Sequence, residues 1–341
     1  MATSSSRQAT GLKMVIIVVV FATKAAVRAL LASLVLTAPF ALAACGQAGD
    51  SGSSGADAGG GAPCPTTPVD VVVSVDQWGD IVSELGGACA KVTTVLAGSA
   101  ADPHDFEPTP SDAANFEGAQ LVVINGGHYD EWAAKLAAST APDAPVVDAV
   151  ALRGSDEEAH AHDGEANSHV WYDPAAVTAL ADAVTARLRQ LAPDAADYFD
   201  ERRIAFTENL KPYDRLIDSI RAGAAGKTYA ATETMFDDMG ATLGLVNRTP
   251  GGYQVASSNH SEPSPADLDA FLQLLSDRGV DVLVYNVQTE GAVPQQLRAV
   301  AEQAGVPVVE ITETVPQDAD SFESWQVDQL TALGEALGVR T

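Results

Sequence analysis

One long helical stretch constrains the fold of this chain more than any other feature. Across residues 193–222, apolar side chains recur three, four and once eight positions apart, which places them along one face of a helix. Pro193 suits the first helical position, where a missing N–H costs nothing. At 1.5 Å per residue such a helix spans roughly 45 Å, longer than one small domain needs. We expect it to bridge two lobes, with an ordinary long core helix as the alternative.

The segments on either side of this helix both read as α/β. Apolar runs with little polar alternation are typical of parallel-sheet strands buried on both faces. These runs are 69–75, 92–96, 121–125 and 146–147 before the helix, and 228–232, 280–285 and 306–312 after it. Helical patterns separate most of them. The sequence therefore predicts an α/β protein with two (βα)-type lobes, each around a mainly parallel sheet, bridged by one long backbone helix.

The N-terminus has the pattern of an export signal. Lys24 and Arg28 precede the apolar run 29–44, which ends at Cys45 in a pattern that resembles the bacterial lipobox. We expect a lipoprotein signal peptide over 1–44 and a lipid on Cys45, which would place the protein on the extracytoplasmic face of the cell membrane. A transmembrane anchor is the alternative, but the apolar runs 15–22 and 29–44 are each shorter than the ~20 residues a span needs. Either Met1 or Met14 could be the start.

A tether and then two lobes should follow the anchor. Residues 45–67 are rich in Gly, Ser and Ala and predict a flexible tether. We then expect an N-terminal metal-binding lobe over 68–192, the bridging helix over 193–222 and a C-terminal metal-binding lobe over 223–341.

Two cysteines remain beyond the lipidation site. Cys64 and Cys89 form an even pair in an exported chain, which favours a disulfide over two free thiols. A cysteine-based metal site is disfavoured, because neither cysteine has a close CxxC partner.

The charge balance limits the classes of partner that the protein can bind. The chain has 46 acidic and 19 basic residues and a formal net charge of −27. Such a surface repels nucleic acid and favours cations, so we expect no nucleic-acid partner. The excess does not identify a ligand by itself.

Four metal-capable side chains lie where ligands bind in open α/β sheets, beyond the carboxyl ends of strands. His104 follows the second predicted strand, and His169 lies just before a capped helix. Glu233 and Glu313 each follow directly on a strand of the second lobe. Two residues from each lobe could hold one cation between the lobes. An isolated His or Glu in a loop is more often solvated surface, and the spacing of these four residues forms no local metal motif.

Several stretches make the chain resemble a family, the solute-binding receptors of bacterial zinc and manganese ABC transporters. They are DPHDFEPTPSD at 102–112, NGGHYDEW at 125–132, SHVWYDP at 168–174, EPSPADL at 262–268 and VPVVEITET at 306–314. The resemblance covers Val69 to the C-terminus. It implies two lobes bridged by a rigid helix, with the metal buried between them. It also implies the ligands in order: His104, His169, Glu233 and Glu313.

The chain departs from the zinc-type pattern of this family in two ways. Glu233 stands where zinc receptors usually have a histidine. The His-rich acidic loop is reduced to His160 and His162, which would either collect zinc weakly or lie incidentally in a disordered acidic loop. Two imidazoles and two carboxylates favour Mn²⁺ as the cargo, although the intrinsic affinity order places Zn²⁺ at least as high.

The function expected from the sequence is a lipid-anchored, monomeric receptor that captures Mn²⁺ or Zn²⁺ outside the cell and delivers it to an ABC permease. It would not be an enzyme. A zinc-dependent hydrolase is one alternative, but the sequence contains no HExxH and no Gly-x-Ser-x-Gly motif. An iron–siderophore receptor is another, but such a site calls for a broad cleft lined by aromatic and Arg side chains.

Overall fold

The computed structural model describes residues 63–98, 104, 106–153, 167–259, 261–289 and 291–340. The chain divides into two units, Met1–Asp57 and Ala58–Thr341, and the description below concerns the second. The predicted signal peptide, the lipidated Cys45 and most of the predicted tether lie outside the described residues, as do His160 and His162.

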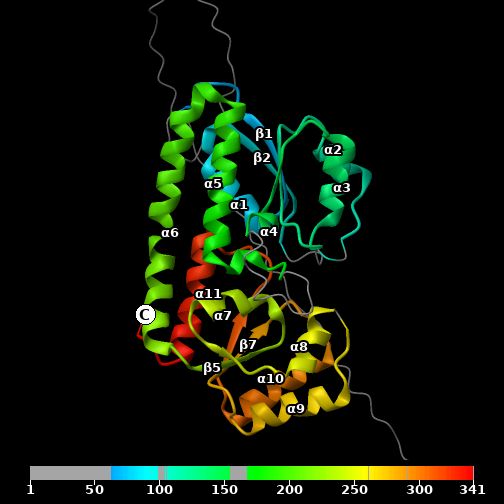
Figure 1. Ribbon diagram of the computed structural model, residues 1–341, viewed down its shortest axis with the longest axis vertical. Helices are drawn as coiled ribbons and strands as arrows, with labels where there is room; N and C mark the ends of the chain where they lie inside the picture. Colours follow the sequence, from blue (N-terminus) through cyan, green and yellow to red (C-terminus); the bar gives the residue numbers. More distant parts are fainter. Residues whose placement is uncertain are drawn as a thin grey trace, which may run out of the picture. The chain divides into compact units, whose positions relative to one another are not determined.

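The N-terminal lobe is built on a four-stranded parallel sheet (Figure 1). Its spatial order is β2-β1-β3-β4, with Val71 of the central strand opposite both Val92 and Leu121. The strands are β1 (Val69–Val75), β2 (Ala90–Leu96), β3 (Leu121–Ile124) and β4 (Val146–Asp148). The helices are α1 (Asp76–Gly86), α2 (Pro110–Asn115), α3 (Glu131–Thr140), α4 (Ala149–Leu152) and α5 (Pro174–Leu191). The valine-rich β1 is central because it can be buried on both faces.

The C-terminal lobe repeats this topology with the spatial order β6-β5-β7-β8. The strands are β5 (Thr228–Ala231), β6 (Val246–Asn247), β7 (Val282–Asn286) and β8 (Val308–Ile311). The helices are α7 (Asp237–Thr242), α8 (Gly251–Ser258), α9 (Pro265–Ser276), α10 (Ala292–Ala304) and α11 (Phe322–Ala336). In each sheet, the first strand lies between the second and the third strand of its lobe. The chain therefore reverses its direction of winding beside the first strand, and ligands bind at such a topological switch point, beyond the carboxyl ends of the strands. The predicted fold class is confirmed.

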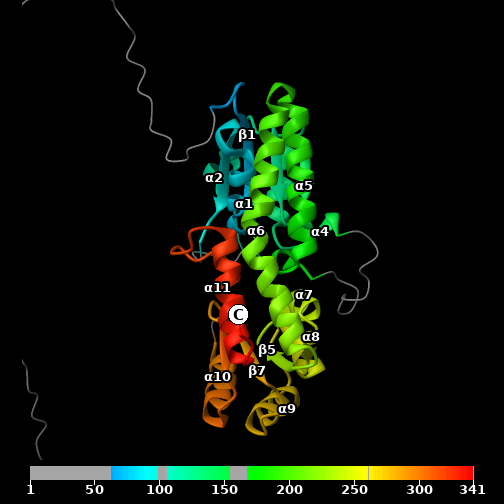
Figure 2. The ribbon, with the colours of Figure 1, turned by 90° about the vertical axis from the view of Figure 1, so that its left-hand side faces the viewer.

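The predicted bridging helix is α6 (Ala196–Ala224), 29 residues long. It runs from beside α5 in the N-terminal lobe to beside α11 in the C-terminal lobe (Figure 2). The helix begins three residues later than predicted, because Pro193–Ala195 form a separate 3₁₀ turn in which Ala195 bonds back to Ala192. Pro212 lies inside the helix.

One apolar core runs through both lobes along α6. It joins Val73 of β1, Phe206 of α6, Ile311 of β8 and Trp325 of α11, all almost completely buried. A second, smaller core around Phe271 belongs to the C-terminal lobe alone. Because the larger core is shared, moving one lobe against the other would open buried apolar surface.

The predicted disulfide between Cys64 and Cys89 is present, with their Cα atoms 5.0 Å apart. It ties the segment before β1 to the 3₁₀ turn Gly87–Cys89 that leads into β2. Among the described residues, none of the helices combines the length and apolar character needed to cross a bilayer.

Candidate metal centre

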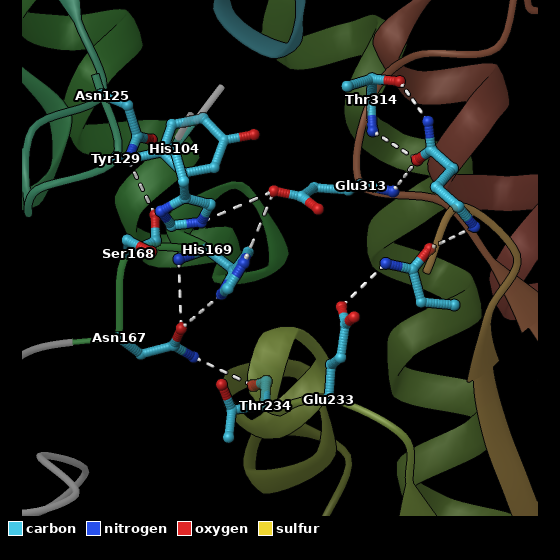
Figure 3. A network of polar contacts seen from close by, with 12 residues as sticks. His104, Asn125, Tyr129, Asn167, Ser168, His169, Glu233, Thr234, Glu313 and Thr314 are labelled. Atoms are coloured by element: carbon cyan, nitrogen blue, oxygen red, sulfur yellow. Dashed lines mark hydrogen bonds and ion pairs between the residues drawn. The ribbon is translucent and has the colours of Figure 1, made fainter. Parts of the chain in front are cut away.

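The four predicted site residues all lie near carboxyl ends of strands or at the start of a helix. His104 lies in the connection from β2 to α2, and His169 precedes the 3₁₀ turn Val170–Tyr172. Glu233 follows β5 and Glu313 follows β8. Figure 3 shows the four side chains in one neighbourhood.

Three of these residues converge on one small space. His104, His169 and Glu313 each offer a ligand atom, and the three atoms lie within 4.8 Å of one another. Both His104 Nε2 and His169 Nε2 are 3.8 Å from Glu313 Oε1. The side chains are only 12 to 17% exposed. Two imidazole nitrogens and a carboxylate oxygen, largely removed from water, are a donor set that divalent transition metals prefer.

Glu233 is not in this group of three. Its Oε2 accepts a hydrogen bond from Asn286 Nδ2 at 2.8 Å, and its Oε1 accepts one from the Thr289 hydroxyl. In Figure 3 the Glu233 carboxylate lies apart from the other three side chains, which face one another. Two local donors thus compensate its charge in this conformation, and the role of Glu233 as a ligand stays a prediction.

Asn167 sets the orientation of His169. Its Oδ1 accepts from His169 Nδ1 at 2.9 Å and from the His169 backbone N–H at 3.1 Å. The amide oxygen can only accept, so Nδ1 carries a proton, and Nε2, which is directed toward Glu313, is the ring nitrogen left to bind a metal. Such a partner on the second ring nitrogen is typical of metal-binding histidines. Asn167 also reaches the C-terminal lobe, because its Nδ2 lies 3.2 Å from both Thr234 O and Asp238 Oδ2.

A buried charge cluster lies beside this network. Arg153 donates two hydrogen bonds of 3.0 Å to the Asp238 carboxylate, and its Nε is 3.3 Å from Asp173. The three side chains are 3 to 11% exposed. Since Arg153 follows α4 and Asp238 belongs to α7, the bidentate pair links the two lobes close to His169.

The backbone at Glu313 is held by side chains from two other elements. Gln288 Oε1 accepts from the N–H groups of Glu313 and Thr314 at 2.5 and 3.0 Å. The Tyr172 hydroxyl donates to Thr312 O at 2.7 Å. Burial raises the pKa of Tyr172, which keeps its hydroxyl a neutral donor. The strand end that carries Glu313 is therefore fixed from both lobes.

Aromatic rings surround the two histidines. The Tyr129 ring meets His104 edge-on at a centroid distance of 4.7 Å, and Trp171 meets His169 at 5.3 Å. Both aromatic side chains are fully buried. They restrict the imidazole rotations and keep the neighbourhood poor in water.

The fold and this site together define a class of protein: a two-lobed α/β protein with a candidate metal site where its lobes meet. The family model described as "Zinc-uptake complex component A periplasmic" matches residues 71–336. The chain belongs to this family.

Relatives in this family bear different metals in their names. The high-affinity zinc uptake system protein ZnuA of Bacillus subtilis (strain 168) is 28% identical over 207 residues, which are 56% of this chain and 62% of that protein. The manganese-binding lipoprotein MntA of Halalkalibacterium halodurans is 23% identical over 214 residues, 61% of this chain and 67% of that protein. The chain thus spans about three-fifths of the length of the Bacillus relative.

A solved structure supports the same fold. The periplasmic zinc binding protein TroA from Treponema pallidum superposes with a TM-score of 0.65 at 19% sequence identity. The match covers 79% of this chain and 98% of that one.

Proposed function

We propose that this protein is an extracytoplasmic receptor that captures Mn²⁺ or Zn²⁺ and delivers it to an ABC permease for uptake. The observation that carries this proposal is the convergence of His104, His169 and Glu313, whose ligand atoms lie within 4.8 Å of one another. Membership in a family described by zinc uptake, with one relative named for zinc uptake and another for manganese binding, supports the same function.

The ligand set that we propose is His104, His169, Glu313 and Glu233. The first three need only small shifts to reach one ion. Glu233 would have to exchange its hydrogen bonds with Asn286 and Thr289 for the metal. Such an exchange exposes no unpaired charge, because the ion replaces the two donors. Its two oxygens can raise the coordination number above four, which suits Mn²⁺, whereas Zn²⁺ is satisfied by four donors.

A receptor accounts for the site better than the alternatives do. A space bounded by three ligand atoms within 4.8 Å fits a bare ion, whereas a siderophore needs a broad cleft. A zinc hydrolase would need an open coordination position beside a general base. The relatives' names describe uptake and binding rather than catalysis, so we propose that this protein is not an enzyme.

Anchoring through a lipid on Cys45 is part of the proposal. The Leu42-Ala43-Ala44-Cys45 sequence supports it, as does a manganese-binding relative that is named a lipoprotein. We expect the folded part to act as a monomer.

Competition titration against a chromophoric chelator tests the function. We expect one Zn²⁺ or Mn²⁺ per chain in the unmodified protein, with His169→Ala losing more than the ~100-fold that outer-shell substitutions cost. His128→Ala is the matched control, because this histidine is 73% exposed and pairs with Glu131 on the surface. Equal affinities for the unmodified protein and His169→Ala would refute the proposed site.

A further inference from the structure

Gln77 connects the two lobes at the metal centre although it contributes no ligand atom. It is the second residue of α1 and is fully buried. Its Nε2 donates to the Tyr129 hydroxyl at 2.9 Å and to the Glu313 backbone carbonyl at 2.9 Å. Both amide N–H groups are therefore used, one within the N-terminal lobe and one across to the C-terminal lobe.

Each of these contacts leads to a proposed ligand. Tyr129 packs edge-on against His104 at 4.7 Å and faces His169 at 6.1 Å, so its ring limits where both imidazoles can lie. Glu313 supplies the carboxylate oxygen that is 3.8 Å from each histidine. A single buried carboxamide thus fixes the distance between the tyrosine that supports both histidines and the backbone of the glutamate.

The preceding residue reinforces this arrangement. The Asp76 carboxylate accepts from the Gly98 N–H at 2.6 Å and from the Val315 N–H. Gly98 lies on the path from β2 to His104, and Val315 follows Glu313 by two residues. The start of α1 therefore holds both ligand-bearing connections, one in each lobe.

We propose that Gln77 is a positioning residue for metal binding, which sets the relative placement of the two histidines and Glu313 across the lobes. This inference rests on the proposed function. The Gln77 amide nitrogen carries two N–H groups, so it can bond the hydroxyl and the carbonyl together. Without the Gln77 amide, the ligands would be ordered only when the ion binds, and this ordering would lower the affinity for the metal.

The test compares Gln77→Met with Gln326→Met. Methionine nearly conserves the volume of glutamine and has no donor. Gln326 on α11 is also fully buried, and its amide atoms find no hydrogen-bond partner among the described residues, so its substitution removes a carboxamide without breaking a side-chain hydrogen bond to them. We expect Gln77→Met to bind Zn²⁺ about 10- to 100-fold more weakly, the range for outer-shell substitutions. We expect Gln326→Met to bind as the unmodified protein does.

The absorption spectrum of bound Co²⁺ separates positioning from general stability, because it reports the coordination geometry. It should change in Gln77→Met and stay unchanged in Gln326→Met. Gln77→Glu, which keeps the size but offers the Glu313 carbonyl a repelling oxygen, should change it as well. Unchanged affinity and an unchanged spectrum in Gln77→Met and Gln77→Glu would overturn the inference. It would also be overturned if neither of these two variants folded without metal, because the role of Gln77 would then be purely structural. If the unmodified protein bound no metal, or His169→Ala bound equally well, the proposed function itself would fail instead.

Discussion

At the scale of single residues, the candidate metal centre depends on side chains that touch no metal. Asn167 holds the proton of His169 on Nδ1 and at the same time reaches Thr234 and Asp238 in the other lobe. It therefore combines a chemical role, the choice of tautomer, with a mechanical one, the link between lobes.

Two substitutions of Asn167 separate these roles. Asn167→Ala removes both and should weaken Zn²⁺ binding about 10- to 100-fold. Asn167→Asp keeps the acceptor for His169 but places a carboxylate beside that of Asp238, so it should preserve the tautomer and weaken the link. We expect its loss of affinity to be smaller, as measured by competition titration. Equal losses in the two variants would mean that the tautomer is not set by this contact.

The proposed role of Glu233 as a ligand needs an experiment of its own, because its carboxylate is hydrogen-bonded to Asn286 and Thr289 and lies apart from the other three proposed ligands. Glu233→His exchanges two flexible oxygens for one nitrogen and removes a negative charge. We expect the ratio of zinc to manganese affinity to rise, because zinc gains more from nitrogen ligands. Parallel titrations with both metals measure it, and an unchanged ratio would remove Glu233 from the ligand set.

At the scale of elements, α1, α6 and α11 meet around a pair of carboxyl groups. Glu84 of α1 accepts from Asn209 of α6 at 2.6 Å, and Arg202 donates to the Glu84 backbone carbonyl. Burial, together with the nearby Glu323 of α11, raises the pKa of Glu84 to about 7. Asp80, one turn earlier, also has a raised pKa because of burial, and it accepts from the first N–H of α11.

This junction predicts a pH dependence of stability. The folded-state pKa of Glu84 lies above its ordinary value, so the protonated form favours folding. Its contribution is complete below about pH 4.5 and is lost as the pH rises through about 7. Between pH 5 and 8 the Tm of the metal-free protein should therefore fall, and Glu84→Gln should flatten this fall.

The exposed Glu208 on α6 supplies the control for this experiment. Glu208→Gln should leave the slope of Tm against pH as it is in the unmodified protein. An identical slope in Glu84→Gln would show that the carboxyl pair does not titrate in this range.

The helices and strands also show how much of the fold can be predicted from a single sequence. Apolar runs predicted the long strands, and a capped helix was expected just after His169, where α5 begins, because these signals are local. The two-residue β6 and the helix α8 went unpredicted, since neither has enough residues to show a period clearly. Contacts across the lobes left no signal at all: Arg153 and Asp238 are 85 residues apart, and Gln77 and Glu313 are 236 apart.

The four site residues were predicted because strand ends and the family resemblance pointed to them, whereas Asn167 and Gln77 were missed. Asn167 lies two positions before His169, but an asparagine in a loop is common and says little by itself. Gln77 does not interrupt the helical pattern of α1, so nothing in the sequence singles it out. Residues that support ligands from another element can be recognised only once the fold has brought them together.

At the scale of the described fold, the two lobes share one apolar core along α6 and meet at the candidate metal centre through Asn167, Gln77 and the Arg153–Asp238 pair. A large hinge motion would break all of these contacts at once. We therefore expect metal binding to order the connections around His104 and His169 more than it rotates the lobes.

The most direct test of the proposed site is anomalous diffraction at the zinc absorption edge from crystals of the zinc-loaded protein. We predict one strong peak per chain, about 2.0–2.2 Å from Nε2 of His104, Nε2 of His169 and a carboxylate oxygen of Glu313. A peak bound by other residues, or no peak at these three side chains in protein that carries one zinc, would contradict the central claim.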